Sequence, residues 1–416
     1  MKILGIIAEY NPFHNGHAYL LAASRDIVCP DYCIAVMSGN FLQRGEVALF
    51  DKYKRSQMAI MGGLDAVYEL PAYYACSSAD EFAAAAVITM KHLSVTHLAF
   101  GAECEDLPSL KKLASVTISE NETFSNCLKE RVAAGDTYAL AYSYAICQCV
   151  TEPGVADILA QPNNMLALCY LRAIFRYCPD MEPVLIPRRE AMYHDTRVQG
   201  TMASAAAIRK HLIDHGISAE IMKTIPASTG IHLPQKNAKI QYLSNHDLSQ
   251  LLTYSLLEHT EQQGELSDIY DISPELANRM AGLSSAFSDF DTLADALKTK
   301  QYTRTRISRS LIHLLLSMKQ DIFSEAKEKG YIFYVRLLGF TKTCSPLIKY
   351  QKLHCPVPYI QKVSQVKNTL DHTNVAKQLF LSDLYASNIY RLCWYHKYGE
   401  ILPDDYQTNA CIVNEE

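Results

Sequence analysis

The sequence predicts an α/β protein in two parts, a doubly wound parallel sheet in residues 1–215 and a mainly α-helical domain in residues 216–416. The first half alternates short apolar runs with helical patterns, which is typical of parallel strands joined by crossover helices. After about residue 215 this alternation fades and helical patterns dominate. The chain has 416 residues, 49% of them hydrophobic, so it can bury a large core and is expected to form two domains.

Local signals fix several elements of the first half. Ser78 followed by Glu81 three residues later is a capping-box pattern that opens a helix, and Gly62-Gly63 predicts the end of the preceding one. The predicted strands are 3–8, 32–37, 66–70, 98–101 and 184–187. The predicted helices are 17–28, 52–61, 79–93, 107–133, 163–177 and 203–214.

The second half is predicted to be mostly helical. Pro274 stands where the first residue of a helix is expected, a position that proline favours. The predicted helices are 247–259, 273–287, 290–300, 308–318 and 374–395, with a strand near 331–338.

Composition indicates a cytoplasmic protein without a membrane span. The apolar N-terminal run is too short for a signal peptide, and no apolar stretch is long enough to cross a membrane. The 13 cysteines are an odd number without repeated CxxC pairs, which favours buried thiols in a reducing compartment. We therefore predict no metal centre built on these cysteines.

Charge is distributed unevenly along the chain. The net charge of −5 conceals a basic segment, residues 298–400, which has 17 Lys and Arg against 6 Asp and Glu and so carries +11. A basic segment of this size indicates a polyanionic partner.

Two histidines mark the candidate site. His14 and His17 flank Gly16 where the first predicted strand passes into the first helix. In an open α/β sheet this edge binds ligands, and a helix N-terminus favours phosphate. Imidazoles there can stabilise charge that develops during attack on a phosphoryl group. A structural histidine pair and a zinc pair are the alternatives, but no further His or Cys stands at metal-ligand spacing.

The residues around these histidines carry a resemblance. Residues 5–17 resemble the HxGH nucleotidyltransferase superfamily, and the string AEYNPFHNGH is similar to the tRNA(Met) cytidine acetate ligase family. The similarity continues through residues 35–46, 65–71, 100–103, 161–166, 193–195 and 302–316. It implies a Rossmann-like sheet of the HxGH type with ATP bound at its edge.

The resemblance also implies a two-step reaction. ATP and acetate would form acetyl-adenylate and pyrophosphate, and the acetyl group would pass to N4 of the wobble cytidine of elongator tRNA(Met). ATP, Mg²⁺, acetate and this tRNA are therefore the expected partners, and the sequence leaves the oligomeric state open. His14 and His17 would be catalytic. The implied ATP-binding residues are Ile7, Ala8, Glu9, Tyr10, Asn11, Pro12, Phe13, Asn15, Gly16, Ala18, Tyr19, Leu20, Gly101, Asn163, Asn164, Arg188, Arg189, Ser204 and Arg209.

A second phosphate motif of the superfamily, ISSTxIR, is weakened here. Ser204 and Arg209 keep its serine and arginine, whereas alanines replace the second serine and the threonine. An alanine-rich helix with an exposed arginine is an equally good interpretation of this segment.

Other residues are candidates for tRNA contact. Gln43 and Arg44 lie in a predicted loop, where binding groups concentrate. Arg304, Arg306 and Arg309 precede an apolar helix in the basic segment, and Tyr302 beside them could stack on a base. The alternative is that these arginines only solubilise a helix.

Two further pairs carry weaker hypotheses. Lys52 and Arg55 could face phosphate or RNA, although a solvated helix face is expected. Asp65 and Glu69 could hold Mg²⁺, but capping or ion pairing explains them equally well.

Two other functions remain open. One is a nucleotidyltransferase that makes a small nucleotide cofactor, which would leave the basic segment unexplained. The other is a non-catalytic RNA-binding protein gated by ATP, which would not need two histidines aimed at a transition state.

Overall fold

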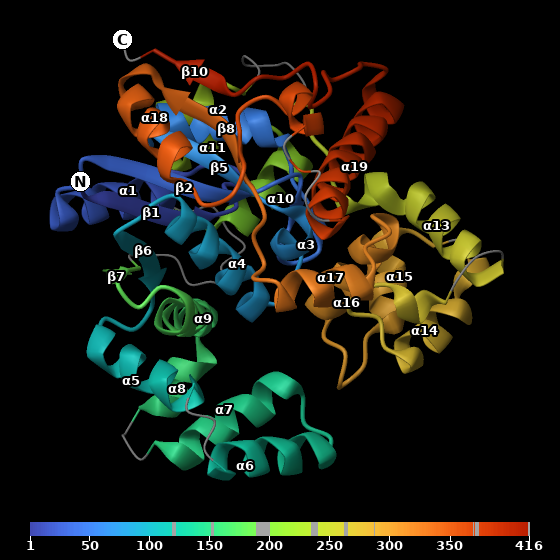
Figure 1. Cartoon of the computed structure of the whole chain (residues 1–416). Coiled ribbons are helices and arrows are strands. Elements are labelled where there is room, and N and C mark those ends of the chain that lie inside the picture. Colours follow the sequence, from blue (N-terminus) through green and yellow to red (C-terminus); the bar gives the residue numbers. More distant parts are fainter. Residues whose placement is uncertain are drawn as a thin grey trace.

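The computed structural model describes residues 1–118, 122–150, 154–188, 200–233, 240–261, 265–286, 288–368, 370 and 374–414. Its centre is a mixed sheet with strand order β10-β8-β5-β2-β1-β6-β7, and β9 pairs with β8 (Figure 1). The strands are β1 (Ile3–Ala8), β2 (Tyr32–Ser38), β5 (Ala66–Leu70), β6 (His97–Ala102), β7 (Glu182–Pro187), β8 (Val335–Thr341), β9 (Tyr359–Ile360) and β10 (Cys411–Val413), with β3 (Phe41–Leu42) and β4 (Glu46–Val47) in a separate hairpin.

The five strands predicted in the first half are confirmed, and all of them run parallel. β1 pairs with β2 and β6, β2 pairs with β5, and β6 pairs with β7. Alternate residues of β2 belong to two apolar clusters: Ile34 and Val36 pack in one, and Cys33, Ala35 and Met37 in the other. Apolar side chains on both faces of a strand are what a sheet covered by helices on both sides requires.

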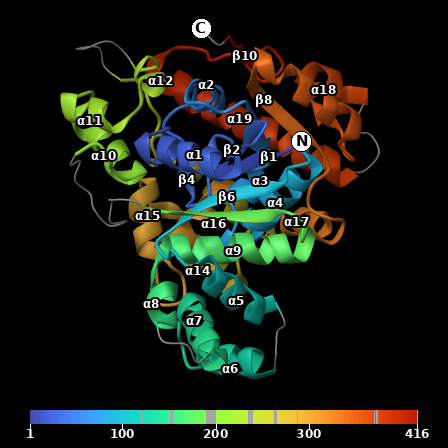
Figure 2. The same cartoon turned by 90° about the vertical axis from the view of Figure 1, so that its left-hand side faces the viewer.

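Helices cover both faces, which confirms the doubly wound class. In the first half these are α1 (Asn15–Val28), α2 (Lys52–Met61), α3 (Ala72–Ala75), α4 (Ala79–His92), α5 (Leu107–Ile118), α6 (Glu122–Ala133), α7 (Tyr138–Cys149), α8 (Val155–Ala160), α9 (Pro162–Tyr177) and α10 (Ala205–His215). Residues of α4 and α9 share one cluster, and residues of α1, α2 and α10 share the other. In Figure 2, α9 runs alongside the strand β7, and α6 and α7 project from the opposite side of α9.

The predicted single helix 107–133 is wrong, because two helices occupy this range. α5 ends at Ile118 and α6 begins at Glu122. The β-branched run Val116-Thr117-Ile118 lowers helix propensity at this point. The predicted helix start at Ser78 is confirmed, since its side chain accepts a hydrogen bond from the backbone N–H of Glu81.

The second half also supplies strands. Its helices are α11 (Ala219–Thr224), α12 (Ala227–Gly230), α13 (Ser249–Glu261), α14 (Pro274–Ala281), α15 (Phe290–Leu297), α16 (Arg304–Leu315), α17 (Gln320–Glu328), α18 (Ser345–His354) and α19 (Asn374–Tyr398), with short 3₁₀ turns at Asn245–Leu248, Leu266–Asp268, Ser284–Ala286, Lys342–Cys344 and Val363–Asn368. The strand predicted near 331–338 is confirmed as β8, which lies antiparallel to β5. Because β8, β9 and β10 extend the same sheet, the division at residues 215 and 216 does not separate the sheet from the helical part.

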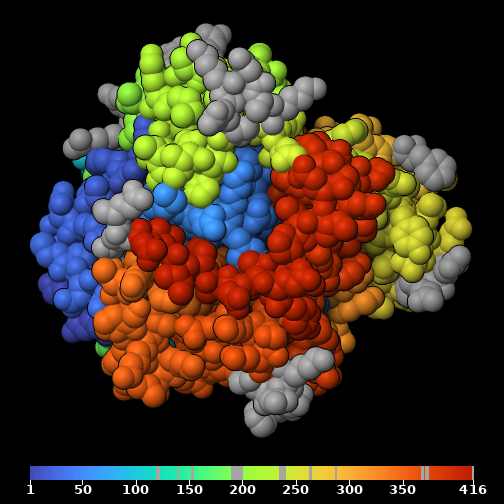
Figure 3. Space-filling view, turned by 90° about the horizontal axis from the view of Figure 1, so that it is seen from above, coloured from blue at the N-terminus to red at the C-terminus, as the bar shows by residue number. Residues whose placement is uncertain are grey.

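A buried ionic network joins the two halves. The ammonium of Lys52 lies 2.8 Å from Glu69 and 3.0 Å from Asp405, and Arg336 lies 3.0 Å from Glu69 and 3.1 Å from Asp405. The prediction of a solvated Lys52 and Arg55 is wrong, because both side chains are fully buried. Figure 3 shows residues from the C-terminal end of the chain, in red, lying beside residues of its first part, in blue.

Asp65 and Glu69 take part in hydrogen bonds and ion pairs. Asp65 accepts a 2.6 Å hydrogen bond from the N–H of Cys33 and pairs with Arg25 at 3.0 Å. Ion pairing and backbone contacts therefore account for both carboxylates. None of the helices in the described ranges combines the length and apolar character needed to cross a bilayer.

Candidate active site

A cavity of about 440 Å³ opens at the carboxyl ends of β1, β6 and β7. This is the edge at which open α/β sheets bind ligands. The sequence-predicted residues that line it are Ile7, Ala8, Glu9, Tyr10, Asn11, His14, Gly16, His17, Tyr19, Leu20, Gln43, Arg44, Gly101, Asn163, Arg188, Ser204 and Arg209. Residues from six separate parts of the chain thus meet at one place.

His14 and His17 form the start of α1. Nδ1 of His14 accepts the N–H of Gly16 at 3.0 Å, and Nδ1 of His17 accepts the N–H of His14 at 3.3 Å. The ring centroids lie 3.8 Å apart. His14 is only 8% exposed, because it caps α1 beneath the cavity.

Both rings are neutral at physiological pH. Burial, reinforced by Arg188 and Arg209, lowers the pKa of His14 to about 3. Burial, with His14 and Arg188, also lowers the pKa of His17 well below its ordinary value. A neutral imidazole whose Nδ1 accepts carries its proton on Nε2. The caps therefore leave each ring with one N–H donor for a ligand.

A glycine is required at position 16 because the ring of His14 lies close to its Cα. A Cβ at this position would lie 2.8 Å from Cε1 of His14, so a larger residue would push the ring from its capping position. Tyr10 adds an edge contact to His17, with centroids 4.9 Å apart, and adopts the left-handed region with φ of +47°. Such a backbone is uncommon outside glycine and is found at functional sites.

Four residues of the predicted ATP-binding stretch do not line the cavity. Phe13 is fully buried and its carbonyl accepts the hydroxyl of Thr229 at 2.7 Å. The amide of Asn15 donates to the carbonyls of Thr201 and Lys223, each at 2.8 Å. The other two are Pro12 and Ala18. The contacts of Phe13 and Asn15 hold the turn between β1 and α1 in place. The residues next to these four in the sequence form the cavity wall.

The two adjacent asparagines, Asn163 and Asn164, have different positions at the opposite wall of the cavity. Arg188 donates to the amide oxygen of Asn163 at 3.1 Å, and this residue lines the cavity. The side chain of Asn164 is buried and bonds the backbone N–H groups of Glu103 and Cys104 at 2.9 and 2.8 Å. Asn164 thus fixes the loop after β6 and does not line the cavity. Arg189 lies outside the described residues.

The weakened second motif lies at the cavity. Ser204 caps α10 by accepting the N–H of Ala207, and Ala205 and Ala206 line the cavity with it. Arg209 pairs with Glu46 at 2.9 Å and donates to the carbonyl of Asn11 at 3.2 Å. The helix N-terminus and the arginine are therefore both present, despite the missing hydroxyls.

The arginines of the basic cluster do not line this cavity. Arg304 pairs with Asp291 at 2.6 Å, while Arg306 and Arg309 lie 3.2 and 4.0 Å from Asp271. The expectation that Tyr302 stacks on a base is wrong, because its ring is buried and lies under the guanidinium of Arg306, 4.9 Å away.

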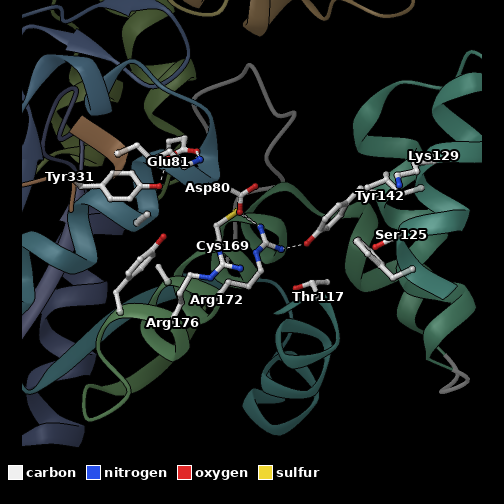
Figure 4. A pocket seen from close by; sticks show the side chains of 16 residues that line it. Asp80, Glu81, Thr117, Ser125, Lys129, Tyr142, Cys169, Arg172, Arg176 and Tyr331 are labelled. Atoms are coloured by element: carbon white, nitrogen blue, oxygen red, sulfur yellow. Dashed lines mark hydrogen bonds and ion pairs between the residues drawn. The ribbon is translucent and has the colours of Figure 1, made fainter. Parts of the chain in front are cut away.

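A second cavity of about 370 Å³ lies between α4, α9 and the α6–α7 hairpin (Figure 4). Its central guanidinium, Arg172, already bonds Asp80, Tyr142 and Cys169. The carboxylate of Glu81, which also lines this cavity, bonds Lys327 at 2.6 Å and Tyr331 at 2.8 Å. Because these groups satisfy one another, the cavity at the sheet edge is the better candidate.

Arg55 and Glu103 hold the backbone at the site, a role that the sequence did not predict for either residue. The backbone carbonyl of Glu9 accepts the guanidinium of Arg55 at 2.5 Å, so this buried arginine fixes the end of β1. Glu103 accepts both the amide of Asn163, at 2.5 Å, and the N–H of Asn164, at 3.0 Å. The sequence signals for Glu103 are its place in the similar stretch 100–103 and directly after a strand that ends at the cavity.

Comparison with known proteins identifies the family. A model described as HIGH Nucleotidyl Transferase matches residues 1–401. The tRNA(Met) cytidine acetate ligase of Thermoanaerobacter sp. (strain X514) is 39% identical over 95% of this chain and 96% of its own, and that of Alkaliphilus metalliredigens is 35% identical over 94% of each. Two crystal structures of Thermotoga maritima TmcAL, one apo and one bound with alpha-thio ATP, cover 100% of both chains at 26% identity, with TM-scores of 0.91 and 0.90. The chain belongs to the HIGH nucleotidyl transferase family and, within it, to the tRNA(Met) cytidine acetate ligases.

Proposed function

We propose that this chain is an ATP-dependent ligase that activates acetate as acetyl-adenylate and acetylates N4 of the wobble cytidine of elongator tRNA(Met). The observation that carries the proposal is the pair of neutral, capped histidines at the sheet edge, in a chain whose relatives bear this name. The structure of one relative with alpha-thio ATP supports ATP as the nucleotide.

In the first step an acetate oxygen attacks the α-phosphorus of ATP and pyrophosphate leaves. Two anions must meet, so donors and cations are needed around the phosphates. His14 and His17 would supply Nε2–H donors to the phosphates, and Arg188 and Arg209 would supply charge. The N-terminus of α10 at Ser204 would add backbone N–H groups.

In the second step the N4 amine attacks the acetyl carbonyl and AMP leaves. Gln43 and Arg44 line the same cavity as the proposed ATP contacts. Their predicted role in tRNA binding therefore fits a cytidine that enters from the side of the β3–β4 hairpin.

Mg²⁺ is expected to arrive with the phosphates of ATP. Within the described residues no group of three or more His, Cys, Asp or Glu is placed to hold a metal ion. The described residues therefore do not by themselves define a metal site, and no step above depends on one.

Acetate-dependent exchange of pyrophosphate into ATP tests the proposal. We expect exchange with acetate and without tRNA, because the first step needs only the cavity at the sheet edge. A cytidylyl- or adenylyltransferase for a small phosphate ester would exchange without acetate. An ATP-gated RNA-binding protein would not exchange at all, so either of these results contradicts the proposal.

The basic segment 298–400 is proposed to contact the tRNA, with Arg306 and Arg309 in that surface. Reversing both to Glu should weaken tRNA binding and lower its salt slope by about one per lost phosphate contact, while exchange stays near normal.

The matched control adds Asp271→Arg to the double variant. This change restores an ion pair with reversed polarity, since Asp271 is the partner of both arginines. Stability should recover while tRNA binding does not. If tRNA affinity and salt slope stay at wild-type values in the double variant, these arginines have no part in the RNA surface.

A further inference from the structure

We propose that Glu9 is the proton acceptor for the N4 amine of cytidine in the acetyl-transfer step. The proposal rests on the function proposed above and assigns to Glu9 a role distinct from ATP contact.

The position of Glu9 supports this role. It follows β1 directly and lines the cavity, where among the described lining residues it carries the only carboxylate. Its Oε1 accepts the N–H of Gln43 at 3.0 Å, which holds the carboxylate next to the β3–β4 hairpin. No described residue donates to Oε2, so this oxygen can accept a proton from a ligand.

The electrostatic surroundings make Glu9 a stronger base than an ordinary glutamate. Burial raises its pKa and the charge of Glu46 adds to this, against the opposing effects of Arg209, the N–H of Gln43 and Arg44. Arg55, whose guanidinium bonds the Glu9 carbonyl, is a further buried charge beside it, while Tyr170 and Cys76 are buried and neutral.

A carboxylate is also poorly suited to bind phosphate. The proposed first step brings a triphosphate and acetate into this cavity, and an additional negative charge repels both. A general base acts where a proton must be removed, and the N4 amine of cytidine must lose a proton in the second step, the acetyl transfer.

The chemistry of the transfer supplies this proton. The N4 lone pair attacks the acetyl carbonyl, a C–N bond forms, and the amine becomes acidic as it gains positive charge. Oε2 of Glu9 takes one N4 proton, the carbonyl re-forms, and the C–O bond to AMP breaks with its electron pair on the phosphate. Glu9 then releases its proton to water. Acetate has no proton to lose in the first step, so that step does not need this base.

Glu9→Gln separates the two steps, because the amide keeps the shape of the side chain and cannot accept the proton. We expect single-turnover acetyl transfer in Glu9→Gln to fall by about 10²–10⁴ relative to acetate-dependent pyrophosphate exchange measured on the same variant. Binding of tRNA(Met) should be unchanged, and Glu9→Asp should restore part of the transfer rate.

The wild-type protein gives an independent measurement. Its single-turnover transfer rate should rise with pH as Glu9 ionises, and this dependence should disappear in Glu9→Gln. If Glu9→Gln abolishes exchange, weakens tRNA binding enough to explain the loss, or leaves transfer intact, Glu9 is not the acceptor. If the wild-type protein shows no acetate-dependent exchange, the proposed function itself fails, which is a different result.

Discussion

Replacing His17 by Ala, or His14 by Asn, is expected to lower acetate-dependent pyrophosphate exchange by about 10²–10³, the usual cost of losing one preorganised donor to a transition state. Each change removes one Nε2–H donor from the cavity at the sheet edge. Asn is chosen at residue 14 because its side chain is a good helix N-cap, whereas Ala would also remove the cap beneath α1.

The control for both variants is the thermal unfolding midpoint, which should stay close to wild type for His14→Asn. The pH profile is a second check. Because the pKa of His14 is lowered to about 3, this ring stays neutral from pH 8 down to pH 5 and its donor is retained. Exchange should therefore show no loss from protonation of His14 in that range. Near wild-type exchange in both variants would exclude the two histidines from the chemistry.

Replacing Lys52 by Met is expected to destabilise the protein by about 3–5 kcal/mol, the usual cost of removing one partner from a buried ionic group. The change leaves two buried carboxylates, Glu69 and Asp405, and among the described residues Arg336 is then the cation that still forms an ion pair with them. Urea unfolding measures the effect. The control is Lys329→Met, which breaks an exposed pair with Glu325 and should cost less than about 1 kcal/mol.

Low pH should weaken the buried ionic network of Lys52, Glu69, Arg336 and Asp405. Burial alone would raise the pKa of Asp405, but Lys52 and Arg336 hold it below its ordinary value. A carboxyl with a depressed pKa stabilises the fold above the pKa of the unfolded chain and loses this contribution as the pH falls. The wild-type protein should therefore lose stability below about pH 4, and Lys52→Met should lose less in this interval. Equal stability of Lys52→Met and Lys329→Met would contradict this account.

The parallel part of the fold was predictable because its signals are local. Short apolar runs, Ser78 at a helix start and Gly62 at a helix end act within a few residues of the chain. The ionic network was not predictable, since Lys52, Glu69 and Asp405 come from distant segments. Lys52 looks solvated from its neighbours alone, and only the fold shows that β8 and the C-terminal residues bury it.

The site was predictable to a similar degree. His14 and His17 follow a strand, which places them at the ligand-binding edge. Their capping bonds were missed because serine, threonine, aspartate and asparagine are the usual caps, and so the helix was expected to begin two residues late. Asn163 and Asn164 are identical in type and adjacent, so only their hydrogen bonds distinguish a cavity residue from a loop anchor.

The position of β8 has a consequence for biosynthesis. Strands β5, β2, β1, β6 and β7 are all translated by residue 187, whereas β8, which covers the edge of β5, begins at Val335. A nascent chain on the ribosome can thus assemble five parallel strands while β5 still presents unpaired N–H and C=O groups. During this interval the free edge of β5 can pair with a strand of another nascent chain on the same polysome. Slow translation between these segments, or a shortage of chaperones, should therefore reduce the yield of this protein more than the stability of its finished fold suggests.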